Sequence, residues 1–156
     1  MTTLQWLYGI LVTIGNALRS PVLLVMRLYW GWQFFLAGNG KLMDLAKPTE
    51  YFQSLGIPFP HANAILAGCT ECFGGLLLLV GLASRLISIP LMIVMVVAYA
   101  TADIDKLRVL FSDPDKFLTA DECLFLLTAV IVFVCGPGLF SLDALIGRFF
   151  KGRHRA

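Results

Sequence analysis

The sequence has few charged residues and few cysteines, and each shortage excludes a class of protein. Charged residues make up 14% of the 156 residues, whereas soluble globular domains carry about 25%. Four cysteines are too few for the disulfide framework of a small secreted domain. A net charge of +2 gives no strongly basic surface for a nucleic acid. The composition therefore excludes an ordinary soluble enzyme, a secreted disulfide scaffold and a nucleic-acid-binding protein.

The common catalytic and nucleotide-binding motifs are also absent from the sequence. It contains no P-loop, no G-x-G-x-x-G, no H-E-x-x-H and no nucleophile elbow. No spacing of residues indicates a nucleophile with its base, or a metal site. An autonomous enzyme is therefore the weakest of the function classes considered below.

Long apolar stretches are what the sequence does have. Hydrophobic residues make up 58% of the chain, and the mean hydropathy is +0.82. About 20 apolar residues cross a bilayer as a helix, and backbone inside lipid must be helical. The sequence predicts an all-α integral membrane four-helix bundle, a single domain over residues 1–156 in contact with the lipid bilayer. Its spans are expected at about 21–38, 62–83, 86–102 and 122–136.

The segment before the first span is apolar but too short to cross a membrane. Leu4 to Leu18 carries Trp6 and Tyr8, and Arg19 and Pro21 are expected to separate it from the first span. It has no basic region at its start, which is untypical of a secretory signal. We expect an interfacial helix anchored by its aromatic rings. A re-entrant segment or a longer tilted first helix is the alternative.

The C-terminal end is expected to form a second interfacial helix. Gly136-Pro137-Gly138 ends the fourth span, and Ser141 is suited to cap a helix over residues 141–150, with Asp143 in its first turn. Residues 151–156 form a basic tail that suits anionic headgroups, although a simply solvated tail has the same composition. An even number of spans places both termini on one side. The basic tail near the membrane favours the cytoplasm for that side.

Two charged residues are expected inside the bilayer, where a charge costs at least roughly 2.5–3.5 kcal/mol and marks a functional candidate. Arg27 lies about 9 Å into the first span, and Glu71 lies about 13 Å into the second. Small residues on the face of Glu71 predict that it points into the bundle.

Arg27 is the natural partner of Glu71, because it is the one cation expected inside the spans. However, side chains lean toward their own helix N-terminus, which moves these two apart. Arg27 snorkelling to the headgroups is the alternative. The pair serves either to hold the bundle together or to bind a substrate or proton.

A C-x-x-C pair, Cys69 and Cys72, lies in the second span. The two thiols share one helix face, but apolar surroundings disfavour the thiolate that redox or metal chemistry needs. Inert packing is therefore the preferred interpretation. A redox pair is the first alternative, and a soft-metal site completed by Met92 or Met95 is the second.

Several short motifs together give the chain a family resemblance. They are Arg27 in the first span, Gly38-Asn39-Gly40-Lys41 at its end, Glu71-x-x-Gly74-Gly75 followed by Leu78, Gly81 and Arg85, and the closing run Gly136-Pro137-Gly138-Leu139-Phe140-Ser141-Leu142-Asp143. In this order the chain resembles the DoxX family of small bacterial four-helix membrane proteins. The resemblance implies a plasma-membrane protein linked to thiol, thiosulfate or quinone redox systems. A quinone cofactor and a redox partner protein are implied by this resemblance alone.

Two functional hypotheses from different classes follow. The first is a membrane subunit or anchor of a redox or stress-response system, in which any enzymatic role is that of an oxidoreductase subunit. The second is a small-molecule or ion carrier with a midplane site at Arg27 and Glu71. The sequence leaves open the substrate, the partner and whether the chain forms an oligomer.

Overall fold

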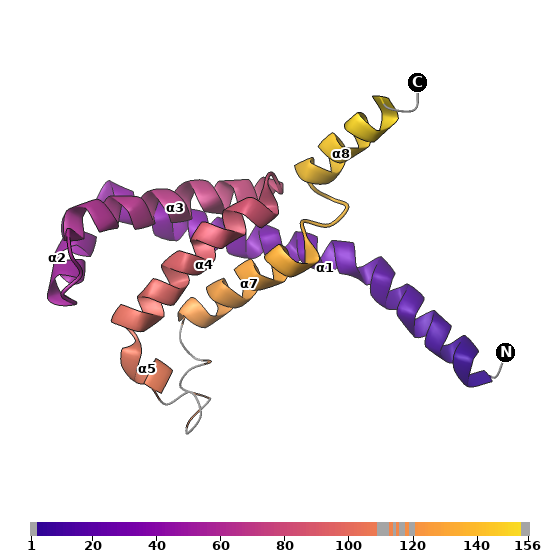
Figure 1. Ribbon diagram of the computed structural model, residues 1–156, viewed down its shortest axis with the longest axis horizontal. Helices are drawn as coiled ribbons and strands as arrows, with labels where there is room; N and C mark the ends of the chain where they lie inside the picture. The colour runs from indigo at the N-terminus through magenta and orange to yellow at the C-terminus, as the bar shows by residue number, and fades with distance from the viewer. Residues whose placement is uncertain (1–2, 109–112, 114, 116–117, 119–120, 154–156) are drawn as a thin grey trace.

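The computed structural model describes residues 3–108, 113, 115, 118 and 121–153, and every element in this part of the chain is a helix (Figure 1). The helices are α1 (Thr3–Met43), α2 (Ala46–Ser54), α3 (Pro60–Val80), α4 (Ser84–Thr101), α5 (Ile104–Arg108), α7 (Asp121–Cys135) and α8 (Leu142–Arg153). Among them α1, α3 and α4 are long and apolar enough to cross a membrane, and α7 is a shorter apolar helix. The all-α membrane fold predicted from the sequence is thereby confirmed.

Helix α1 differs from the sequence prediction, because it is continuous through Pro21. The break expected at Arg19 and Pro21 is not there. Proline removes one N–H from the helix ladder, and a long apolar helix tolerates this single loss. With 41 residues, α1 is about 60 Å long, twice the hydrocarbon core of roughly 30 Å. Its first half therefore continues past the bundle, and residues 5–19 are all exposed.

The bundle packs as two helix pairs around a shared apolar core. Helix α1 lies along α3, and α4 lies along α7. The core residues come from all four helices: Phe34, Leu78, Leu91, Met95, Ala129 and Val132. The Phe34 ring meets Phe125 of α7 edge-on at 4.5 Å between centroids. Because this contact joins α1 to α7, it connects one helix pair to the other.

Glycines let α1 and α3 approach until their backbones touch. A Cβ on Gly31 would stand 2.9 Å from the Leu79 N, and one on Gly75 would stand 2.7 Å from the Gly31 O. A Cβ on Gly38 would stand 2.6 Å from the Gly68 O. The small-residue face predicted from the sequence is confirmed as the α1–α3 interface.

The two ends of the bundle differ. The first half of α1 and the whole of α8 leave from one end, so both termini lie there (Figure 1). Ser141 caps α8 as predicted, since its Oγ accepts a hydrogen bond from the Ala144 N at 3.1 Å. The predicted basic tail begins as the last turn of α8, and residues 154–156 lie outside the described part of the chain.

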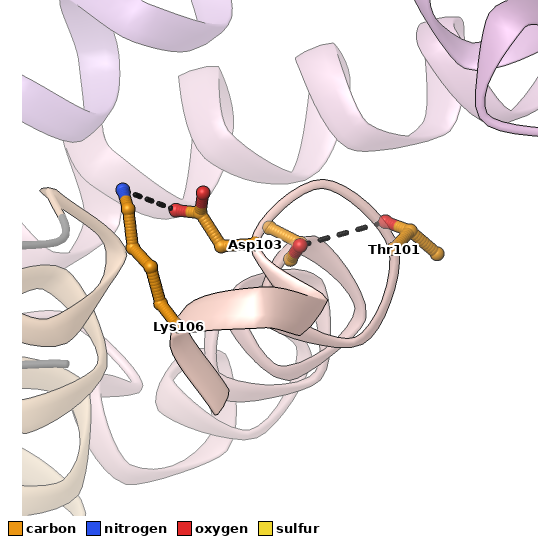
Figure 2. Close-up of polar contacts among 4 residues, drawn as sticks. Thr101, Asp103 and Lys106 are labelled. Atoms are coloured by element: carbon orange, nitrogen blue, oxygen red, sulfur yellow. Dashed lines mark hydrogen bonds and ion pairs between the residues drawn. The ribbon is translucent and has the colours of Figure 1, made fainter. Parts of the chain in front are cut away.

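The opposite end carries α2 and the α4–α5 corner (Figure 1). There the Lys106 ammonium binds the Asp103 carboxylate at 2.9 Å (Figure 2). This ion pair is local, because Asp103 lies between α4 and α5 and Lys106 lies in α5. It stands at the start of the predicted 103–121 loop, of which only part is described.

Candidate functional site

Both charged residues predicted inside the membrane are buried in the bundle, Arg27 at 1% and Glu71 at 2% exposure. They lie at different levels. Gly38 packs on Gly68, and the Arg27 guanidinium lies over Gly81. The two helices are therefore antiparallel, and a residue nearer the start of α1 faces one nearer the end of α3. From Gly81 to Glu71 is ten residues, about 15 Å along the helix. The structure therefore does not bring Arg27 and Glu71 together as an ion pair.

Arg27 instead binds backbone carbonyls of the loop between α7 and α8. Its Nη1 donates to the Pro137 O, and its Nη2 donates to the Phe140 O at 2.7 Å. Its Nε is buried without a partner among the described residues. Carbonyls after a helix C-terminus lack intrahelical donors, and a buried cation satisfies two of them here. Arg27 thus neither snorkels nor pairs with Glu71.

The turn between α3 and α4 completes this end of the bundle. Gly81 has φ +74°, and a side chain there would meet the Arg27 guanidinium. The Asp143 carboxylate accepts hydrogen bonds from the Ala83 N at 2.7 Å and from the Ser84 N at 2.9 Å. Its own N–H donates to the Gly81 O at 3.0 Å. Asp143 therefore caps α4 from a distant helix, a role that its place in the sequence does not reveal.

Glu71 forms its ion pair with Lys41, from the last turn of α1. Lys41 is 31% exposed, so one partner reaches the surface while the other is enclosed. The Lys41 Cβ lies 3.4 Å from where a Gly68 Cβ would stand. The Leu42 Cδ2 lies closer still, at 2.9 Å, so Gly68, one turn before Glu71, lets the end of α1 that carries Lys41 approach α3.

The direction of side chains explains this choice of partner. In antiparallel helices each side chain leans toward its own N-terminus. Lys41 near the end of α1 therefore leans into the bundle, and Glu71 leans toward the end where Lys41 lies. The same rule moves Arg27 and Glu71 apart. Lys41 is the site residue that the sequence prediction missed, and this rule was the signal that could have found it.

The cysteine pair lies beside Glu71. Cys72 is buried, and a Cβ on Gly38 would meet its backbone, whereas Cys69 is half-buried; both are free thiols. The residues that the structure describes contain no group of three or more His, Cys, Asp or Glu side chains that could hold a metal ion. The backbone of Cys72 therefore lies against Gly38, where α1 and α3 are closest.

The short motifs of the sequence assemble into two sites rather than one. Arg27, Gly81 and the closing run 136–143 meet at the end that carries the termini. Gly38, Lys41 and Glu71 meet toward the other end. We call these the arginine site and the glutamate site. Each motif alone is weak evidence for the family, and in the structure each contributes residues to one of the two sites.

Comparisons with known proteins agree with this assembly. The DoxX family model matches residues 22–103. A protein of Bacillus subtilis (strain 168), named "Putative oxidoreductase CatD", is 29% identical over 130 residues, covering 83% of this chain and 88% of that protein. "Uncharacterized membrane protein Rv3486" of Mycobacterium tuberculosis (strain ATCC 25618 / H37Rv) is 32% identical over 146 residues, covering 85% and 86%. No solved structure matches the chain at a significant level.

The family match covers more than half of the chain and includes Arg27, Lys41, Glu71 and Gly81. These residues build most of the two buried sites, and the predicted resemblance is confirmed. The chain belongs to the DoxX family of membrane proteins.

Proposed function

We propose that this protein is a plasma-membrane subunit or anchor of a thiol- or quinone-linked redox or stress-response system, with both termini in the cytoplasm. The observation that carries the proposal is its similarity, over 83% of its length, to a protein named as an oxidoreductase. Both buried charges have partners within the fold. Electron transfer would then be supplied by a partner protein or a bound quinone.

The test is to purify the protein in mild detergent from the membranes of its own organism. The purified complex and the isolated chain are compared for bound quinone and for quinone-dependent thiol oxidation. We expect activity from the complex and none from the chain freed of its partner. Full activity of the isolated chain would contradict the role of subunit or anchor.

The orientation is tested by labelling single cysteines in a background without the native four. A probe in the 103–121 loop should react with an impermeant reagent from outside. A probe after Arg153 should react only once the membrane is opened. The reverse pattern would invert the proposed topology.

A second candidate function, a small-molecule or ion carrier, is favoured by the glutamate site. Glu71 is 2% exposed, and its ion-pair partner Lys41 is 31% exposed. A lysine that swings outward would leave a buried carboxylate open to a cation or proton. Because Arg27 is bound by carbonyls, this candidate now rests on Glu71 and Lys41 rather than on Arg27 and Glu71. If proteoliposomes that contain the protein take up a cation or protons, and Glu71→Gln abolishes this uptake, the carrier is supported over the redox anchor.

A further inference from the structure

The exposed end of α7 is held by two further arginines that the buried sites do not use. Arg19 of α1 donates from its Nη2 to the Cys135 O. Arg85 of α4 donates from its Nη2 to the Val134 O at 3.4 Å. Both arginines are exposed. Since the two carbonyls belong to successive residues, guanidinium groups from two different helices gather at one helix end.

In the part of the chain that the structure describes, no carboxylate forms an ion pair with Arg19 or Arg85. A helix C-terminus carries about half a negative charge, against two full positive charges from Arg19 and Arg85. The Asp143 carboxylate accepts hydrogen bonds from the Ala83 and Ser84 N–H groups, and the positive charge that it faces is the Arg27 guanidinium. Each guanidinium has five N–H donors, and contacts with the described residues use one on Arg19 and one on Arg85. Donors and positive charge both remain available to a ligand.

The backbone beneath Arg85 leaves space for its guanidinium. Gly136 has φ +77°, and a Cβ there would stand 3.3 Å from the Arg85 Nη2. A larger residue would be strained at this φ and would crowd the guanidinium. The glycine that ends α7 therefore also keeps Arg85 close to the carbonyl end of that helix.

We propose that Arg19 and Arg85 bind the phosphate of an anionic phospholipid headgroup at the end of the bundle that carries both termini. Guanidinium groups bind phosphate through paired, charge-assisted hydrogen bonds. Basic pockets between transmembrane helices at headgroup level are known lipid sites.

The residues beside the two arginines favour a lipid as the source of the phosphate. Leu18 is 54% exposed, Leu86 is 70% exposed and Val134 is 66% exposed. Each adjoins one of the arginines, either in the sequence or through the carbonyl that the arginine binds. Acyl chains packing on this apolar surface would place their headgroup at the guanidinium pair. A free phosphate ion has no acyl chains and would gain nothing from contact with this apolar surface.

The experiment uses the full-length protein in a neutral detergent and measures lipid binding by native mass spectrometry and by the shift in melting temperature. Phosphatidylglycerol is titrated against phosphatidylcholine and against inorganic phosphate. The test variant is Arg19→Gln with Arg85→Gln, in which the amides can still donate to the α7 carbonyls. The control is Arg148→Gln, which removes one positive charge from an exposed position of α8 at the same end. It is compared with each single variant, Arg19→Gln and Arg85→Gln, as well as with the double variant.

We expect phosphatidylglycerol to bind the wild type more tightly than phosphatidylcholine. The double variant should bind it about ten-fold more weakly or worse, as the loss of charge-assisted hydrogen bonds predicts. The control should change by less than about two-fold, because a single exposed charge contributes little.

Equal loss of binding in the double variant and in Arg148→Gln would overturn the proposal, because the attraction would then be nonspecific. Stabilisation by inorganic phosphate alone would overturn the lipid as the source. Should the double variant fail to fold, the wild type still decides the question, since equal affinity for the two lipids refutes a site for an anionic headgroup.

Discussion

The two buried charges of this protein are stabilised in different ways. At the arginine site, Arg27 is held by backbone carbonyls of the loop after α7. At the glutamate site, Glu71 is held by the side chain of Lys41, which reaches the surface. Carbonyls belong to the fold and cannot move away without unfolding the loop. A lysine side chain with four methylenes can move away without disturbing any helix.

This difference separates a fixed end of the bundle from one that can open. The arginine site joins α1, the α3–α4 turn and the loop before α8 through hydrogen bonds from at least three elements. At the glutamate site, the ion pair that the described residues form joins α1 to α3. A ligand or partner that needs a buried charge would therefore find it at Glu71, whereas Arg27 is occupied by the structure itself.

The largest loss of stability is expected from a substitution at the arginine site. Arg27→Met removes the donors to two loop carbonyls, those of Pro137 and Phe140. At roughly 1.5–3 kcal/mol for each charged hydrogen bond, the free energy of unfolding should fall by about 3–6 kcal/mol. Thermal unfolding in detergent measures this loss, and Arg148→Met on the exposed face of α8 is the control. A loss as small as that of the control would show that the carbonyls find other donors.

The glutamate site should respond asymmetrically to its two single substitutions. Lys41→Met strands a carboxylate that is 2% exposed, and breaking a buried pair in this way costs about 3 kcal/mol or more. Glu71→Leu leaves Lys41 able to turn toward the surface, so the loss should be about 1 kcal/mol or less. The double variant should recover part of the Lys41→Met loss. Equal losses from the two single substitutions would mean that Lys41 is as confined as Glu71.

The fold was largely predictable because lipid restricts the choice of structure. Four apolar stretches predict four helices, since backbone inside a bilayer must satisfy its own hydrogen bonds. The continuity of α1 was not predictable from the same pattern. Proline disfavours a helix locally, whereas the apolar run on both sides of Pro21 favours one. Composition does not tell which of these effects is larger.

The sequence predicted which charged residues are buried, but it did not predict which groups they bind. Burial of Arg27 and Glu71 followed from the cost of charge in lipid and from the glycines beside them. Their partners depend on the register of α1 against α3, which is set where Gly38 meets Gly68. The carbonyl partners of Arg27 were not predictable, because every residue has a carbonyl. Lys41 was within reach of sequence reasoning, through the direction in which side chains lean.

The register itself provides the next test, since both sites depend on it. Gly38→Ala places a Cβ against the backbone of Cys72 and 2.6 Å from the Gly68 O. Backbone cannot shift as a side chain can, so the free energy of unfolding should fall by about 1–3 kcal/mol. Gly40→Ala is the matched control in the same helix, because no atom lies within 4 Å of its Cβ position. Equal effects of the two substitutions would place the closest approach of α1 and α3 elsewhere.

The smallest expected effect is the coupling between the two sites. Arg27 and Glu71 lie about 15 Å apart along the bundle, and the partners that the structure gives them are different. Substitutions at sites without shared partners add to within about 0.3–0.5 kcal/mol. Arg27→Lys combined with Glu71→Leu should therefore destabilise the protein by the sum of the two single effects. The lysine variant is chosen because it keeps the charge and leaves enough stability to measure.

The same cycle applied to Lys41→Met and Glu71→Leu is the positive control, because those residues touch. It should show a coupling of about 1 kcal/mol or more, within the range found for contacting residues. A coupling of that size between Arg27 and Glu71 would mean that they meet during unfolding or in another conformation. The arginine site would then not be fixed, and the midplane carrier with both residues would again be the better hypothesis. Additivity at the distant pair with coupling at the near pair would leave Glu71 and Lys41, among the described residues, as the ion pair that a ligand or partner can open.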